Sequence, residues 1–246
     1  YRHLRANTRA TFSIMDVTKP TSIMCITGQS DTHLTDIQNH RLHSAIISDF
    51  LALQSAAQKA GFELTIASSF RDFNRQSIIW NNKFLGIRPV YNKQQKVVNL
   101  TKLNDVDKCI AIMLYSALPG ASRHHLGTDL DVFDKAAVSD DYKLQLTPDE
   151  YLQGGPFAPL SNWLDTNLVK FGFYRPYQHD LGGVAPELWH ISHIKQSQLL
   201  VNTLSEQVLF ECIKNSELQG KQAILDNLPA IYKRFVTNVS PHLKEG

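Results

Sequence analysis

The segment that most constrains the fold of this chain is residues 119–134, with the sequence PGASRHHLGTDLDVFD. His124 and Asp131 are seven residues apart, so one continuous helix would place both on the same face. The pair Pro119–Gly120 and Gly127 are unfavourable inside a helix. We therefore expect a loop that carries His124, a reversal of the chain at Gly127, and then a strand.

The expected strand covers residues 128–133, where polar and apolar side chains alternate. Successive side chains of a strand point to opposite faces of its sheet. Asp129 and Asp131 therefore share one face, and Leu130 and Val132 share the other. The pattern predicts that carboxylates face a cleft while the apolar side chains face a core.

A second informative segment is residues 185–192, APELWHIS. A catalytic zinc ion needs three protein ligands, an open position for water and a nearby general base. Glu187 and His190 supply a base and a third ligand close together in the sequence. Positions three apart in a straight strand face opposite ways, so we expect a bend at Pro186.

A third segment is residues 66–76, IASSFRDFNRQ. It indicates a strand that ends near Arg71, where a guanidinium can bind a carboxylate or stabilise a developing oxyanion. Gln76 could add a hydrogen bond to a substrate. A single arginine is more often found in a surface ion pair, so Arg71 alone would not indicate catalysis.

Two residues of the first segment, His125 and Asp129, each have two possible roles. His125 is either the true metal ligand in place of its neighbour His124 or a solvated residue. Asp129 is either an additional polar group in the cleft or a turn and pairing residue. A His-x6-Asp spacing alone is a weak indication of metal binding. The prediction of a metal site therefore depends on all three segments occurring together.

The rest of the chain predicts helices and short strands. Apolar residues recur at helical spacing over 36–60, and a strand is expected at 62–67. Asn104 is expected to cap a helix, and Thr147 to Glu150 fit a capping box. We expect an irregular N-terminal segment (1–35), a catalytic domain (36–195) and a helical C-terminal appendage (196–246). Further elements are expected at 159–170 (helix), 188–194 (strand), 196–214 (helix) and 221–238 (helix).

Composition excludes several classes of protein. The net charge is +2, which gives no electrostatic reason to expect a nucleic-acid partner or a membrane surface. The sequence has no run of about 18 apolar residues, so no membrane span is expected. The three cysteines lack CxxC spacing, so neither a disulfide framework nor a thiolate zinc site is expected. Free cysteines favour a cytoplasmic location; a periplasmic one is the alternative if an export signal has been removed.

Together, the three segments resemble the D-alanyl-D-alanine carboxypeptidase family of zinc peptidases. This family belongs to a wider group with lysostaphin-type enzymes and the hedgehog signalling domain. The resemblance covers about residues 36–195. The family pattern Ser-x-His-x-x-Gly-x-x-x-Asp is filled by Ser122, His124, Gly127 and Asp131, its downstream Glu-x-x-His by Glu187 and His190, and its upstream Ser-x-x-Arg with a later Gln by Ser68, Arg71 and Gln76.

The resemblance implies an α+β fold: a central antiparallel sheet with flanking helices, to which this chain adds the C-terminal appendage. It implies one zinc ion, bound by His124, Asp131 and His190, with Glu187 as the general base. Arg71 would stabilise the transition state, and Ser122 and Gln76 would contact the C-terminal residue of the substrate. Ser68 and Asp129 are further candidate substrate contacts. Asp129 is a departure, because many members of the family carry alanine there.

The implied activity is removal of a C-terminal D-alanine from peptidoglycan-derived peptides or muropeptides. Two versions are open: an L,D-carboxypeptidase acting on tetrapeptides, or a D,D-carboxypeptidase acting on pentapeptides, in peptidoglycan recycling or remodelling. The alternative is a zinc-stabilised binding module of the same fold without catalysis. Such a module could dispense with Glu187 and Arg71, so the presence of both favours an enzyme.

Overall fold

The computed structural model describes residues 22–241. The first part of the expected irregular segment (1–21) and the end of the appendage (242–246) lie outside the described residues. The strands are β1 Leu34–Ile37, β2 His40–His43, β3 Leu64–Ser68, β4 Asp129–Asp134, β5 Phe173–Tyr174 and β6 His190–His193. The helices are α1 Ile23–Ile26, α2 Ile47–Lys59, α3 Phe73–Phe84, α4 Asp105–Met113, α5 Pro148–Tyr151, α6 Ala158–Asn167, α7 Ile194–Thr203, α8 Glu206–Lys214, α9 Lys221–Asp226 and α10 Leu228–Ile231.

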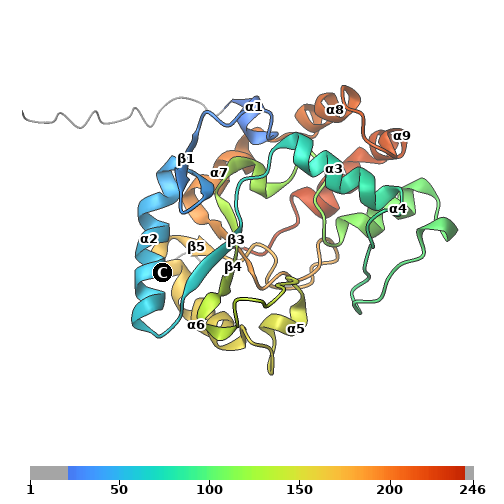
Figure 1. The fold of residues 1–246 in the computed structure, drawn as a ribbon. Coiled ribbons are helices and arrows are strands. Elements are labelled where there is room, and N and C mark those ends of the chain that lie inside the picture. Colours follow the sequence, from blue (N-terminus) through green and yellow to red (C-terminus); the bar gives the residue numbers. More distant parts are fainter. Residues whose placement is uncertain (1–21, 242–246) are drawn as a thin grey trace, which may run out of the picture.

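The centre of the fold is a four-stranded antiparallel sheet in the order β3-β4-β6-β5 (Figure 1). This confirms the expected α+β fold with a central antiparallel sheet. The register is informative, because Asp131 of β4 pairs with Ser68 of β3 on one side and with His190 of β6 on the other. Two of the expected metal ligands are therefore cross-strand neighbours.

One face of this sheet is covered by α2 and α6. Leu130 and Val132 of β4 are fully buried there, together with Phe50 of α2 and Leu164 of α6. The predicted alternation along β4 is confirmed. Because the apolar side chains fill this core, the carboxylate of Asp131 is left on the opposite face, toward the polar cluster described below.

The helix expected from residue 36 begins only at Ile47, so that prediction was wrong over residues 36–46. β1 and β2 form an antiparallel hairpin there, in which Ile37 pairs with His40. The two residues between them, Gln38 and Asn39, have φ angles of 49° and 63°. Positive φ at both central positions is typical of a type I′ hairpin turn, whose twist matches that of the strands. The turn therefore overrides the helical spacing of the apolar residues that follow.

The C-terminal helices share a core with the central part of the chain. Residues of α7 to α10 pack with Trp80 of α3, Cys109 of α4 and Leu126 in one continuous apolar cluster. The indole nitrogen of Trp80 also donates to the carbonyl of Gln219, at 3.0 Å. Figure 1 shows α8 and α9 beside α3. The described part of the appendage is thus an integral layer of the structure.

The C-terminal segment also holds the loop that precedes β6. The Arg234 side chain donates from Nε to the carbonyl of Gly182, at 2.8 Å, and Asn238 donates to the carbonyl of Leu181, also at 2.8 Å. A Cβ atom added to Gly183 would lie 2.1 Å from the carbonyl oxygen of Arg234, so the two segments are in close backbone contact. The position of this loop therefore depends on the end of the chain.

Two local predictions are confirmed. The Asn104 side chain accepts from the backbone of Asp107 and caps α4. Thr147 and Glu150 form the expected capping box of α5. Within residues 22–241, no helix is long and apolar enough to cross a lipid bilayer.

Candidate active site

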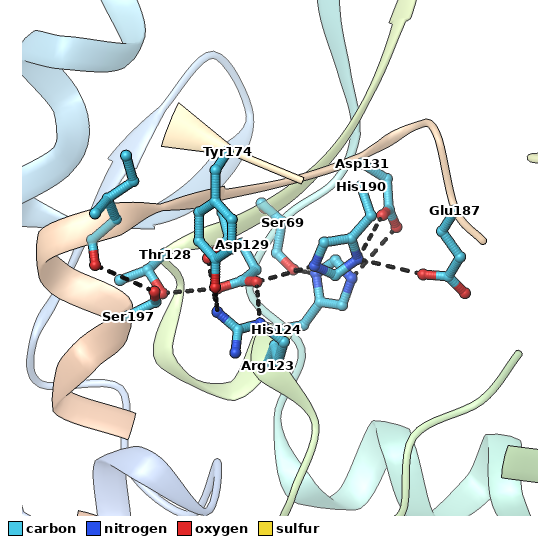
Figure 2. A network of polar contacts seen from close by, with 12 residues as sticks. Ser69, Arg123, His124, Thr128, Asp129, Asp131, Tyr174, Glu187, His190 and Ser197 are labelled. Carbon is cyan, nitrogen blue, oxygen red and sulfur yellow. Dashed lines mark hydrogen bonds and ion pairs between the residues drawn. The ribbon is translucent and has the colours of Figure 1, made fainter. Parts of the chain in front are cut away.

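Three side chains converge on the open face of the central sheet. His124 comes from a 3₁₀ turn (η3, Arg123–Leu126), Asp131 from β4 and His190 from the start of β6. His124 Nε2 is 3.4 Å from Asp131 Oδ2, and His190 Nδ1 is 3.3 Å from Asp131 Oδ1. One ligand atom from each residue lies within 4.8 Å of the others. Figure 2 shows both rings directed toward the carboxylate.

This arrangement fits a zinc ion. Donors placed tetrahedrally at the usual zinc bond lengths of about 2.0–2.1 Å are about 3.3 Å apart. The measured separations around Asp131 are close to that value. All three side chains are buried, and Asp131 Oδ1 has no hydrogen-bond partner within residues 22–241. A buried carboxylate oxygen facing two imidazoles is what a divalent ion requires.

The outer nitrogens of both rings are fixed by acceptors. His124 Nδ1 lies 2.9 Å from the carbonyl oxygen of Ser69, and His190 Nε2 lies 2.9 Å from Asp129 Oδ1. A carbonyl and a carboxylate can only accept, so these two nitrogens carry the ring protons. In the neutral rings that a metal ion requires, the lone pairs lie on His124 Nε2 and His190 Nδ1, the atoms that face Asp131. Such partners orient imidazole ligands and raise their basicity.

His125 points away from this cluster. Its Nδ1 lies 2.6 Å from the carbonyl oxygen of Arg71, and its Nε2 accepts from the backbone of Gly120, at 3.0 Å. The ring is fully buried, and this burial lowers the pKa of His125 to about 4. Both nitrogens are therefore occupied within the fold, and His124 is the residue of this pair that faces the metal position.

Glu187 lies beside the ligand cluster, with Oε2 3.5 Å from His190 Nδ1 (Figure 2). The expected bend occurs two residues after Pro186: the backbone of His190 donates to the carbonyl of Glu187, which closes a turn. β6 therefore starts at His190, two residues later than predicted. Burial raises the pKa of Glu187, although the interaction with His190 opposes this effect. A carboxylate that holds a proton more readily is suited to proton transfer.

Arg71 is fixed in place by two residues that were expected to bind substrate. Its guanidinium donates to Gln76 Oε1 at 2.9 Å and to Ser68 Oγ at 3.1 Å. The amide of Gln76 in turn donates to the carbonyl of Ala117, at 2.6 Å, and its side chain is fully buried. The structure thus places Ser68 and Gln76 as supports of Arg71.

Asp129 also lies behind the site. Its Oδ1 accepts from Arg123 Nε at 2.7 Å, and its Oδ2 accepts from Thr128 at 2.9 Å, in addition to the contact with His190. Burial opposes ionisation of Asp129, but Arg123 and His190 outweigh it and hold the pKa of this carboxyl well below its usual range. The pair of Asp129 and Arg123 is almost completely buried. Sequence analysis did not identify Arg123, because nothing in the spacing of the segment indicates this contact.

A cavity of about 500 Å³ opens beside the ligand cluster. It is lined by His124, Asp131, His190, Glu187, Arg71 and Ser122, so six of the nine predicted site residues meet there, whereas Ser68, Gln76 and Asp129 are outside its lining. It is also lined by Lys83, Arg88 and Tyr115, which sequence analysis missed. A larger cavity of about 800 Å³ lies between α1, α3 and α8, and contains none of these residues. The candidate active site is therefore the smaller cavity, because the residues with catalytic chemistry line it.

Comparison with known proteins agrees with this geometry. The VanY family of D-alanyl-D-alanine carboxypeptidases matches residues 39–196. An uncharacterized protein of Haemophilus influenzae is 46% identical over 98 residues, which are 38% of this chain and 67% of that protein.

Two solved structures are similar to this chain, and the first of them supports the fold. VanYB in complex with D-alanine-D-alanine is 21% identical, with a TM-score of 0.50, over 77% of this chain and 92% of that one. A variant of the vancomycin-resistance D,D-pentapeptidase VanY in complex with Zn(II) is 20% identical, with a TM-score of 0.48, over 78% and 88%. The family match covers more than half of the chain and includes every residue of the metal cluster. This chain therefore belongs to the D-alanyl-D-alanine carboxypeptidase family of zinc peptidases.

Proposed function

We propose that this protein is a carboxypeptidase that removes the C-terminal D-alanine from peptidoglycan stem peptides. The observation that supports this most strongly is the position of Glu187, 3.5 Å from His190 and in the same cavity as Arg71. Two imidazoles, a carboxylate, a base and a guanidinium form the set of groups needed for hydrolysis of an amide by a metal-bound water. A binding module would need only the three ligands.

Each residue has a distinct role in this proposal. His124, Asp131 and His190 would hold a zinc ion, which would supply Lewis-acid activation of a water molecule and of the scissile carbonyl. Glu187 accepts the proton of the attacking water at Oε2 and returns it to the leaving amine. Arg71, which Ser68 and Gln76 hold in place, stabilises the negative charge that develops on the carbonyl oxygen.

Two substrates fit this chemistry. The related VanYB was solved with D-alanine-D-alanine, the terminal unit of a pentapeptide. The other substrate is the tetrapeptide, from which an L,D-carboxypeptidase removes D-alanine at an L-configured centre. In a cytoplasm, the tetrapeptide is the better substrate, since a D,D-enzyme there would destroy wall precursors. Incubation with defined tetra- and pentapeptides, followed by measurement of released D-alanine, decides between them.

The assignment of the base has its own test. We expect Glu187→Gln to bind zinc like the unchanged protein and to lose activity by about 10²- to 10⁴-fold, the usual contribution of a general base. His124→Ala should instead lose the metal. Metal analysis and the D-alanine assay on both variants separate the two roles. Full activity in Glu187→Gln would refute the assignment of Glu187 as the base.

A further inference from the structure

Four arginine and lysine side chains line the cavity. Arg123 is paired with Asp129, at 2.7 Å, and the other three are Arg71, Lys83 and Arg88. Among residues 22–241, none of the three lies within ion-pairing distance of a carboxylate. Charged groups that are withdrawn from water are normally paired. Arg71 and Lys83 are partly buried, whereas Arg88 is exposed. Two partly buried cations without an ion-pair partner beside a catalytic cluster therefore indicate a ligand that brings negative charge.

Lys83 is the most constrained member of this group. It lies in the last turn of α3, and its Nζ donates to the hydroxyl of Ser116 at 2.6 Å. An ammonium has three donors, and Ser116 accepts the one side-chain hydrogen bond that Lys83 Nζ makes within residues 22–241. Burial lowers the pKa of Lys83 to about 8, while the nearby charge of Glu187 acts in the opposite direction. Lys83 is therefore mostly charged at pH 7 and close enough to Glu187 to respond to its charge.

The chemistry of an exopeptidase places a negative charge at this position. In the proposed reaction, the leaving residue has its amine next to Glu187 and its carboxylate at the other end. One residue spans at most about 3.6 Å, so the group that binds this carboxylate must lie near the base, on the leaving side. Lys83 lines the same cavity as Glu187, and the charge of Glu187 acts on the pKa of Lys83. Gln76 is not available for this role, because Arg71 and the carbonyl of Ala117 already occupy its amide.

We propose that Lys83, positioned by Ser116 and assisted by Arg88 at the exposed rim, binds the terminal carboxylate of the substrate. This inference rests on the proposed function and identifies the residue that makes the cavity select peptide ends. A peptide that continues past the scissile bond, or one with an amidated end, leaves the ammonium without its partner. A charge-assisted hydrogen bond of this kind corresponds to about 10- to 100-fold in affinity.

The test compares two stem peptides that differ only at the end: a free carboxylate or a carboxamide. Binding of each is measured by calorimetry in the zinc-loaded Glu187→Gln background, with and without Lys83→Met. We expect the Glu187→Gln protein to bind the free acid about 10- to 100-fold more tightly than the amide. Adding Lys83→Met should abolish this preference, mainly by weakening binding of the acid, and Lys83→Arg should restore part of it. Lys59→Met, at an exposed position of α2, is the matched control and should leave the preference unchanged.

Turnover of the same peptides by the protein with Glu187 intact separates the proposed function from the role of Lys83. If both peptides bind with the expected preference but neither is cleaved, the proposed function fails and the role of Lys83 stands. If the free acid is cleaved but Lys83→Met weakens binding of acid and amide by the same factor, Lys83 has only a structural role and the inference is wrong. An unchanged ratio of the affinities for the acid and the amide in Lys83→Met would likewise show that the inference is wrong.

Discussion

Asp129 holds the outer nitrogen of His190: its Oδ1 lies 2.9 Å from His190 Nε2, while the inner nitrogen of the same ring faces Asp131. The imidazole is thereby fixed between two carboxylates. Asp129 is itself paired with Arg123, at 2.7 Å, so the negative charge behind the ring is balanced. This buried chain of contacts makes Asp129 a support of the metal ligand. Of the two alternatives that the sequence left open, the pairing residue is the one that the structure supports, and not the substrate contact.

The first prediction concerns this pair. In the double variant Arg123→Met/Asp129→Ala, no buried charge is left unpaired, but His190 loses its acceptor. We expect the protein to fold and to bind zinc about 10- to 100-fold more weakly, the usual effect of removing such a partner. Competition with a chromophoric chelator measures this affinity. Unchanged affinity would show that Asp129 does not orient the ligand.

The single variant Asp129→Ala should behave differently, because Arg123 then remains buried without a partner. We expect it to be destabilised by about 3–5 kcal/mol, measured by urea unfolding of the metal-free protein. Arg175→Met/Asp165→Ala removes another ion pair, away from the ligands, and is the control: it should leave zinc affinity unchanged.

The second prediction concerns the loop before β6. Gly183→Ala would place a Cβ 2.1 Å from the carbonyl oxygen of Arg234 and push the loop away from the C-terminal segment. Because the backbone of Glu187 donates to Tyr177 of the same loop, we expect the base to shift. A displacement of about 1 Å can cost up to about 10²-fold in rate, so kcat should fall while zinc content stays constant. Gly182→Asn is the control, since nothing lies within 4 Å of its Cβ position.

The third prediction is a dependence on pH. Burial lowers the pKa of Lys83 to about 8, so the ammonium that binds the substrate is lost as the pH rises through 8. We expect kcat/KM for the free-acid peptide to fall above this pH and the value for the amide to show no such step. Ser116, Glu187 and the two arginines face this group, and arginine keeps its charge over the range. In Lys83→Arg the step should disappear; a step that persists would be due to another group.

The metal cluster could be predicted because each of its residues lies in a short segment with an informative pattern. The alternation along β4 identified the face that carries Asp131, and the resemblance supplied the pairing with His124 and His190. What the sequence could not provide was the register of the sheet, which places Asp131 directly opposite His190. No short turn joins β4 to β6, so the register between them depends on contacts between segments far apart in the chain.

Lys83 was missed for the same reason, because its position depends on a contact with a distant part of the chain. Lys83 is held by Ser116, 33 positions further along the chain, so nothing in its local sequence distinguishes it from other lysines. The hairpin at 34–43 was mistaken for the start of a helix because its turn residues, Gln38 and Asn39, include no glycine. The helical appendage was expected from its apolar spacing, but its packing against Trp80 is a tertiary contact that spacing does not predict.

The most direct test of the account is the zinc content of the purified protein, measured by elemental analysis after dialysis against zinc and then against buffer. Asp131→Asn keeps the size of the side chain but removes the charge that faces both imidazoles. We expect one zinc ion per chain in the unchanged protein and a loss of most of it in Asp131→Asn, with Asp140→Asn, at a fully exposed position, as a control that retains it. A protein without zinc, or an Asp131→Asn variant that holds the ion as firmly as the unchanged protein, would contradict the proposed metal site.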